Sequence, residues 1–251
     1  MPRYFIEVAY NGKNYAGFQV QQNANTIQSE VEKAFGVFFY QKLELTGSSR
    51  TDAGVHSLQN FYHVDTNLIL ERKHIYNLNA ILPPDIVIKN IYNVAIDAHC
   101  RFLANYRSYE YFVYQTKNPF LKETAWHFPF NINIDALKEA AQVVKSYSNF
   151  TTFSKKHTQV NNFNCQILHS QWVQEKDCLI YQVKANRFLR GMVKGLVGTM
   201  LQVGRENISI ERFKEIIEAQ NCNLANFTPP SHGLFLVEVN YPNGVLNNPI
   251  H

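Results

Sequence analysis

Hydrophobic positions in the first hundred residues switch between a period of two and a period of 3.6, the periods of strands and helices. Alternation over residues 3–10 predicts a strand that ends at the turn pair Asn11-Gly12. A helical period follows, and Asn25 and Gln28 have the spacing of a capping box at its start. The remaining patterns predict two strands, a helix and a last strand, at residues 42–47, 59–66, 71–82 and 85–94.

The second half repeats this order of elements. Its longest helix is predicted from about Arg187 to Val203, closed by Gly204. The other patterns predict strands at 107–115, 165–173, 178–185 and 233–241, and helices at 135–147 and from Ser209. Because no linker separates the halves, we expect an α+β fold of two ferredoxin-like (βαββαβ) subdomains, residues 1–104 and 105–251, that share a mainly antiparallel sheet.

Composition favours a folded protein outside the membrane. The chain has 251 residues, of which 45% are hydrophobic, so it can bury a sizeable core. No stretch approaches the apolar length of a membrane span, and the predicted first strand leaves no room for a signal peptide. We therefore expect a cytoplasmic protein.

The cysteine pattern predicts neither a disulfide framework nor a metal site. The four cysteines form no CxxC pair, and the spacing places no histidine at ligand distance beside any of them; they are Cys100, Cys165, Cys178 and Cys222. We expect reduced thiols that serve mostly in packing, and no metal.

Positive charge is concentrated in the second half. Residues 1–104 hold nine Lys or Arg and nine Asp or Glu, whereas residues 105–251 hold fifteen against eleven. No acidic residue lies between Cys178 and Gly204. This segment is either a solvated face or a surface that binds phosphates, and the charge alone leaves both open.

The predicted helix after residue 187 carries three basic residues at spacings i, i+3 and i+7, which places Arg187, Arg190 and Lys194 on one face. Three glycines lie on or near the same side: Gly191, Gly195 and Gly198. Glycine weakens a helix, so close approach of another backbone or of a ligand has to explain them. An anionic cleft and tight helix packing explain the pattern equally well. The chain also lacks a GxxxxGK[ST] loop, a GxGxxG loop and a GxSxG elbow.

Two positions, one aromatic and one acidic, are candidates for base stacking and for catalysis. Most aromatics of the strand "YRSYEYFVY" belong in a core, but Tyr109, near the start of that strand, could instead stack on a base. In the loop "SSRTDAGVHS", Asp52 and Gly54 are typical turn residues. The cation of Arg50 would also keep the Asp52 carboxylate ionised, which suits a nucleophile. His56 is more typical of a structural hydrogen bond.

The stretch "RTDAGVH" resembles the catalytic loop of the tRNA pseudouridine synthase A (TruA) family. Six further stretches resemble that family in the same order, from about Arg3 to Tyr241: "YNGKNYAGFQVQ", "TIQSEVEKAF", "LNAILPPDI", "HCRFLANYRSYEY", "NRFLRGMVKGLVGTMLQVG" and "PPSHGLFLVEVNY". The resemblance implies two α+β subdomains joined into one sheet with a central RNA-binding cleft, and a homodimer that grips the tRNA. It implies an isomerase that converts uridine to pseudouridine at positions 38, 39 and 40 of the anticodon stem-loop, without a cofactor or metal.

The resemblance also implies roles for single residues. Asp52 is the expected catalytic nucleophile, and the residues leave open whether it attacks C1′ or C6. Arg50 is expected to fill the space left by the flipped nucleotide and to pair with Asp52. Tyr109 is expected to stack on the target base and handle the C5 proton, with Leu234 on the base's other side.

Lys194 stands where the family usually has an arginine that pairs with the catalytic aspartate. Lysine keeps the charge but lacks the bidentate fork of arginine. We assign Lys194 the same catalytic role, and expect Arg187 and Arg190 to line the path of the RNA phosphates.

Two alternatives stay open at this point. A catalytically silent RNA-binding platform would use the same basic edge and aromatic residues, and lysine at position 194 lends it weight. A small-molecule glycosidase would need two carboxylates, and no obvious second one accompanies Asp52.

Overall fold

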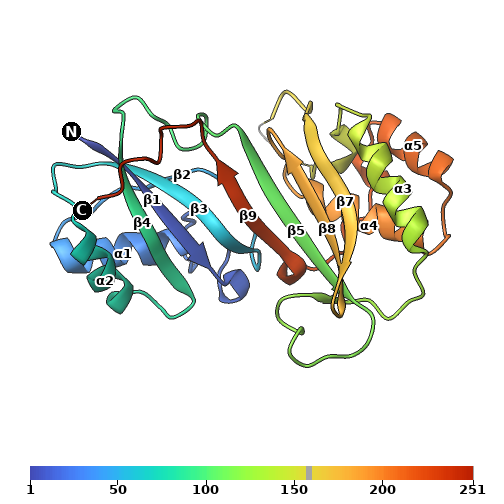
Figure 1. Ribbon diagram of the computed structural model, residues 1–251, viewed down its shortest axis with the longest axis horizontal. Coiled ribbons are helices and arrows are strands. Elements are labelled where there is room, and N and C mark those ends of the chain that lie inside the picture. Colours follow the sequence, from blue (N-terminus) through green and yellow to red (C-terminus); the bar gives the residue numbers. More distant parts are fainter. Residues whose placement is uncertain (157–159, 251) are drawn as a thin grey trace. The chain divides into compact units, whose positions relative to one another are not determined.

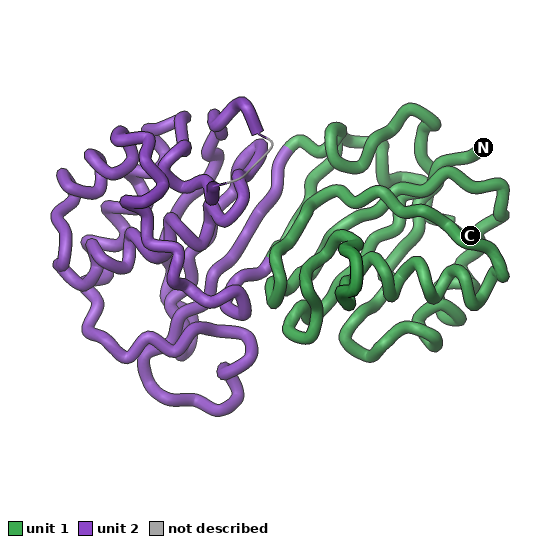
Figure 2. Tube along the Cα trace, turned by 180° about the vertical axis from the view of Figure 1, so that it is seen from behind, with its two compact units in different colours: residues 1–105, 236–251 green, residues 106–235 purple. Residues whose placement is uncertain are grey.

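The computed structural model describes residues 1–156 and 160–250 (Figure 1). These residues form two compact units, coloured separately in Figure 2. Unit 1 comprises Met1–Asn105 and the C-terminal segment from Leu236, and unit 2 comprises Tyr106–Phe235. The expected boundary at residue 104 adjoins the observed one. The C-terminal segment, which the sequence pattern assigned to the second half, packs with unit 1 instead.

Unit 1 has the predicted βαββαβ order of elements. Its strands are arranged β4-β1-β3-β9, with β2 also paired to β3, and β1 runs antiparallel to both of its neighbours. The elements are β1 (Arg3–Tyr10), η1 (Gly12–Asn14), α1 (Ile27–Phe39), β2 (Thr46–Gly47), β3 (His56–Asp65), α2 (Arg72–Ile81), β4 (Ile86–Val94) and, from Leu236 onward, β9 (Leu234–Asn240). Both helices lie on the same face of this sheet (Figure 1).

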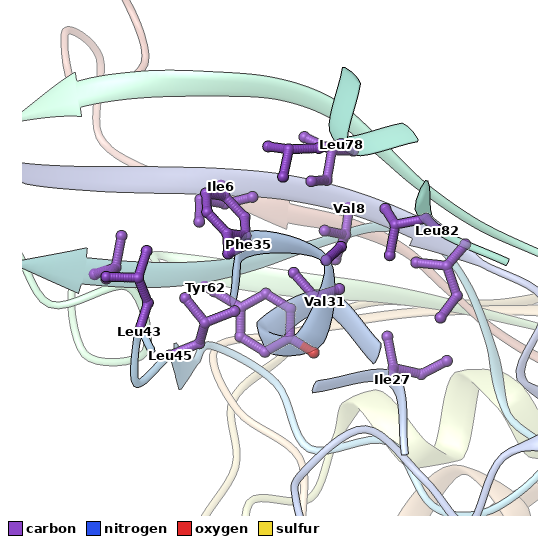
Figure 3. Close-up of a cluster of buried hydrophobic side chains, with 14 of the residues drawn as sticks. Ile6, Val8, Ile27, Val31, Phe35, Leu43, Leu45, Tyr62, Leu78 and Leu82 are labelled. Carbon is purple, nitrogen blue, oxygen red and sulfur yellow. The ribbon is translucent and has the colours of Figure 1, made fainter. Parts of the chain in front are cut away.

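The core of unit 1 lies between that sheet face and the two helices (Figure 3). The predicted face of β1 supplies Tyr4, Ile6, Val8 and Tyr10, which are all buried. The other face of β1 is covered as well, because Tyr241, just after β9, packs its ring 5.3 Å from that of Phe5. Simple alternation in β1 therefore underestimates its burial.

Two local predictions in unit 1 are wrong in detail. The N-cap of α1 is Thr26, which forms its capping box with Ser29 rather than placing Asn25 at the cap. Gln28 instead donates its side-chain amide to the Leu45 carbonyl at 2.7 Å, so a tertiary contact uses the expected capping partner. The strand expected over residues 42–47 is reduced to the two residues of β2.

The described residues of unit 2 form a sheet of three long strands with one short added strand, together with three α-helices. The strands are ordered β5-β8-β7 with antiparallel pairing, and the short β6 adds to β5 in parallel. Its elements are β5 (Tyr106–Tyr114), β6 (Trp126–His127), α3 (Ile134–Lys145), η2 (Thr151–Phe153), β7 (Ile167–Glu175), β8 (Cys178–Ala185), α4 (Met192–Gly204), α5 (Ile210–Glu218), η3 (Cys222–Leu224) and η4 (Ser231–Gly233). The architecture of the chain is therefore α+β with mostly antiparallel strands.

The long basic helix begins five residues later than its sequence pattern predicts. Gly191 is the N-cap of α4 and has a left-handed backbone with φ of 76°, so Arg187 and Arg190 precede the helix. The backbone carbonyl of Arg190 accepts a hydrogen bond from the amide of Lys155 at 3.0 Å. The prediction that Arg187, Arg190 and Lys194 share one helical face is wrong, because this tertiary bond and the glycine turn interrupt the periodic stretch.

Tight packing explains the glycines inside α4. A Cβ at Gly198 would lie 2.2 Å from the backbone oxygen of Asn226, and one at Gly195 would lie 2.8 Å from the ring of Phe227. The packing alternative is thus the correct one for these two positions. Within the described part of the chain, no helix combines the length and the apolar character that crossing a membrane requires.

We predict opposite effects of the same substitution in two helices. Gly198→Ala forces a methyl group against the Asn226 backbone and should lower the free energy of unfolding by about 1–3 kcal/mol. In Gly36→Ala of α1, the added methyl group meets no other part of the structure within 4 Å. This substitution should raise the free energy of unfolding by roughly 0.5–1 kcal/mol. Urea unfolding measures both, and shifts of the same sign would contradict the packing argument.

Candidate active site

The loop between β2 and β3, residues 48–55, is anchored along its backbone. The carbonyl of Thr51 accepts a hydrogen bond from the Phe18 amide at 3.1 Å. The carbonyl of Ser49 accepts one from the side-chain amide of Asn60 at 2.9 Å. The loop is therefore fixed on two sides, by the segment before α1 and by β3.

The predicted turn at Asp52 is confirmed. The Val55 amide donates to the Asp52 carbonyl at 3.2 Å, and Gly54 takes the positive φ of 76° that such a turn gives to glycine. Asp52 itself is half-buried, and it is the only acidic residue of the loop. The turn thus holds one carboxylate at a defined position near the surface.

A buried tyrosine fixes the residue before the carboxylate. The hydroxyl groups of Tyr10 and Thr51 are hydrogen-bonded at 2.8 Å, and Asn60 donates to the Tyr10 oxygen at 3.2 Å. Burial raises the pKa of Tyr10 to about 12, so its hydroxyl stays neutral at physiological pH. This polar network is enclosed and keeps Thr51 in place.

Two glycines allow the segment after β1 to lie directly against the loop. A Cβ at Gly12 would lie 1.9 Å from the Val55 carbonyl oxygen, and Gly17, with φ of 112°, approaches the Thr51 carbonyl. The Gly12 amide donates to Nδ1 of buried His56 at 3.2 Å. The structural interpretation of His56 is therefore confirmed.

Arg50 lies on the same loop and is exposed. It lines a pocket of about 270 Å³ in unit 1, together with residues of the segment after β4. Its pairing with Asp52 stays a prediction.

Tyr109 is less buried than the residues that follow it on the same face of β5. Tyr111 and Val113, on the same face of the strand, are fully buried, as predicted for core residues. Tyr109 is only half-buried, and its ring meets the ring of Phe188 at 4.9 Å and 78°. Tyr109 thus lies outside the core, with an edge contact between its ring and that of Phe188.

Lys194 is one of two residues of α4 that escape burial, the other being Gln202. Its Nζ donates to Oγ of Ser231 at 3.3 Å. The same segment is tied to β5, because the Tyr111 hydroxyl donates to the Pro230 carbonyl at 2.7 Å. Unit 2 thus brings Lys194 next to the segment that leads into β9.

Leu234 is the first residue of β9 and only 7% of its side chain is exposed. The preceding Gly233 packs against the ring of Tyr111, where a Cβ would lie 2.8 Å away. The position of Leu234 is therefore fixed by β5. Its contact with a base stays a prediction.

The expected basic surface at Arg187 and Arg190 lies before α4 and includes a third basic residue. Arg190 is exposed and Arg187 half-buried, both in the loop before α4. Lys155 joins them, since its side chain covers Gly191 at 3.0 Å from a Cβ built there. The sequence analysis missed Lys155, although the pair Lys155-Lys156 was a visible signal.

One cluster in unit 1 has the residue types of a metal site. Candidate ligand atoms of His63, His99 and Cys100 lie within 4.8 Å of one another. The expectation that no histidine accompanies a cysteine is wrong for Cys100. Its Sγ lies 3.1 Å from Nδ1 of His63 and 3.1 Å from the Thr46 carbonyl oxygen.

These contacts are direct hydrogen bonds. Ligands that share a tetrahedral zinc ion lie about 3.5 Å or more apart, because the metal separates them. The 3.1 Å contact between sulfur and nitrogen is shorter. We therefore interpret the cluster as a structural link between β3, β2 and the segment after β4.

This link makes stability depend on pH. Burial, with the nearby His99 and Arg3, lowers the pKa of His63 to about 4. Between pH 6.5 and 4 the unfolded chain binds a proton that folded His63 rejects, so acidification should lower the free energy of unfolding. Urea unfolding at pH 7 and pH 5 should show a smaller loss for His63→Gln than for the parent protein. Equal losses would show that His63 does not carry the effect.

Comparisons with known proteins identify the family of the chain. A family model described as tRNA pseudouridine synthase matches residues 146–242. Proteins named tRNA pseudouridine synthase A are similar over nearly their whole length. That of Parabacteroides distasonis is 41% identical over 96% of this chain and 97% of its own. That of Bacteroides thetaiotaomicron is 38% identical over 98% of this chain and 93% of its own. That of Bacillus subtilis is 36% identical over 94% of this chain and 98% of its own. These matches confirm the family resemblance that the sequence motifs indicate, and the chain belongs to the tRNA pseudouridine synthase A family.

Proposed function

We propose that this protein isomerises uridine to pseudouridine in the anticodon stem-loop of tRNA, at positions 38, 39 and 40, with Asp52 as the nucleophile. Membership of a tRNA pseudouridine synthase family supports the reaction. The observation that carries the role of Asp52 is its presentation. A half-buried carboxylate stands on a turn whose preceding residue, Thr51, is hydrogen-bonded to Tyr10 and Phe18, and which the Val55 amide closes by donating to the Asp52 carbonyl.

The reaction explains why a fixed carboxylate is needed. The N1–C1′ bond breaks, the base turns over, and a C5–C1′ bond forms while the C5 hydrogen leaves as a proton and N1 gains one. A carboxylate bonded to the nucleotide retains the detached fragment during this exchange. A rigid turn places that carboxylate without a conformational search.

Residues of unit 2 complete the proposed machinery. Tyr109 stacks on the target base and takes part in transfer of the C5 proton, a role supported by its half-exposed ring. Lys194 pairs with the Asp52 carboxylate, and its bond to Ser231 limits where its ammonium can lie. Leu234 packs on the base, while Arg187 and Arg190 bind the RNA backbone.

The wider proposal follows the family. The protein works in the cytoplasm as a homodimer, and its two halves are ferredoxin-like subdomains that share a sheet and an RNA-binding cleft. Support comes from the βαββαβ order of unit 1 and from the full-length similarity to proteins named tRNA pseudouridine synthase A.

We predict that Asp52→Asn abolishes isomerisation, because the neutral amide is not a nucleophile. Tritium release from tRNA labelled at C5 of uridine should fall by roughly 10⁴-fold or more. Binding of unmodified tRNA should remain measurable. Asp97→Asn, the same change at an exposed site of unit 1, should leave turnover unchanged.

Turnover by the Asp52→Asn variant at the parental rate would rule out the nucleophile. Tight tRNA binding by the parent protein with no tritium release would instead favour the catalytically silent RNA-binding platform.

We predict that the positive charge at position 194 matters more for activity than the bidentate geometry that an arginine would add. Lys194→Met should lower kcat by about 10²-fold, since the carboxylate loses its cation, while Lys194→Arg should stay within about tenfold of the parent. Gln202→Met alters the other unburied position of α4 and serves as the control. Loss of activity in Lys194→Arg equal to that in Lys194→Met would contradict a charge-based role.

A further inference from the structure

The pocket beside the Asp52 loop carries features that the proposed reaction does not use. It has a volume of about 270 Å³, enough for a nucleobase, and it belongs entirely to unit 1. Its lining includes Arg50 from the loop, and His99, Arg101 and Phe102 from the segment after β4. No acidic residue is among the ten that line it. The pocket therefore has the charge to attract a phosphate.

An exposed aromatic ring stands at this pocket. The side chain of Phe102 is 75% exposed, although a phenylalanine of a folded protein is usually buried. The ring of His99 lies 4.3 Å from the Phe102 ring at 40°, and the Arg101 guanidinium lies 5.6 Å over its face. An open aromatic ring with a histidine and an arginine beside it is a surface on which a base can stack.

The segment that carries these residues is rigid. The amides of Phe102 and Leu103 both donate to the His99 carbonyl, at 3.1 and 3.0 Å, and the Arg101 amide donates to Nδ1 of His99 at 3.1 Å. Cys100, between them, is buried and accepts a hydrogen bond at its carbonyl from Oγ of Ser48 at 2.8 Å. Ser48 begins the catalytic loop, so the aromatic ring and the loop are fixed to each other.

We propose that this pocket binds a second nucleotide of the RNA strand, next to the one that is isomerised. Arg101 and Arg50 bind its phosphate, and its base stacks on Phe102 and His99. Two guanidinium groups suit a phosphate because each offers a fork of donors. This proposal rests on the proposed tRNA substrate. It adds a positioning site in which Arg50 of the Asp52 loop is joined by three residues without a role in the isomerisation, His99, Arg101 and Phe102.

The binding test uses the Asp52→Asn background, so that no turnover occurs, and unmodified tRNA transcript as the probe. Phe102→Ala should weaken binding about 5- to 150-fold with an unchanged salt dependence, because it removes stacking but no charge. Arg101→Gln should weaken binding and reduce the slope of log affinity against log salt by about 0.7. Two exposed positions on α2 are matched controls: Tyr76→Ala and Arg72→Gln should bind like the parent.

Conservative variants separate stacking from folding. Phe102→Trp should keep the affinity of the parent, whereas Phe102→Leu, which is apolar but has no aromatic face, should bind as weakly as Phe102→Ala. Restored binding in Phe102→Leu would show that the ring serves packing alone, and would overturn the proposal. So would affinities of Phe102→Ala and Arg101→Gln equal to those of the α2 controls.

Two further measurements separate the possible ligands and the two proposals. If Phe102→Ala loses binding of uridine 5′-monophosphate but keeps that of tRNA, the pocket serves a free nucleotide and the proposal is wrong. With Asp52 restored, the pocket variants should raise KM for tRNA and leave kcat unchanged in the tritium assay. Absence of tritium release from the parent would refute the proposed function, while the binding comparison would still decide the pocket.

Discussion

The buried hydrogen bond between the hydroxyl groups of Tyr10 and Thr51 holds the candidate catalytic loop against the end of β1. A loop exposes polar backbone groups that must find partners when the chain packs over them. Here Asn60 and Phe18 supply those partners, and glycine at position 12 lets the chain approach without a Cβ. The backbone that carries the Asp52 carboxylate is therefore anchored to the sheet and to the segment before α1.

Unit 2 holds its charged side chain in a comparable way. Helix α4 is buried along almost its whole length, and Gly195 and Gly198 let neighbouring segments touch its backbone. Lys194 is the exception near the start of the helix, and Ser231 binds its ammonium group. Close packing fixes the backbone of α4, and a hydrogen bond to Ser231 directs the ammonium group of Lys194.

A further set of polar contacts joins the candidate catalytic loop to the rest of unit 1. Cys100 bonds to His63 and Thr46 through its sulfur, and its carbonyl accepts from Ser48. Because Cys100, His63 and Ser48 are buried and hydrogen-bonded, the segment of residues 99–102 has little freedom to move. The exposed ring of Phe102 is therefore presented as rigidly as Asp52, which is what a site for a second nucleotide requires.

The sequence by itself determined the elements whose signal is local. Strands β1 and β8 begin and end where their patterns predict, because two-residue alternation and turn residues lie within the segment. It also determined the loop chemistry, since Asp52 and Gly54 specify a turn by their own side chain and φ preference.

Only the tertiary structure decided where α4 begins. Gly191 and the bond between Lys155 and Arg190 delay its start, although the sequence pattern looks helical from residue 187. It also decided that His63 meets Cys100, and that Arg50 and Arg101 share a pocket. The physical reason is the same in each case. These contacts join residues far apart in the chain, and strand pairing and packing bring them together where no local periodicity records it.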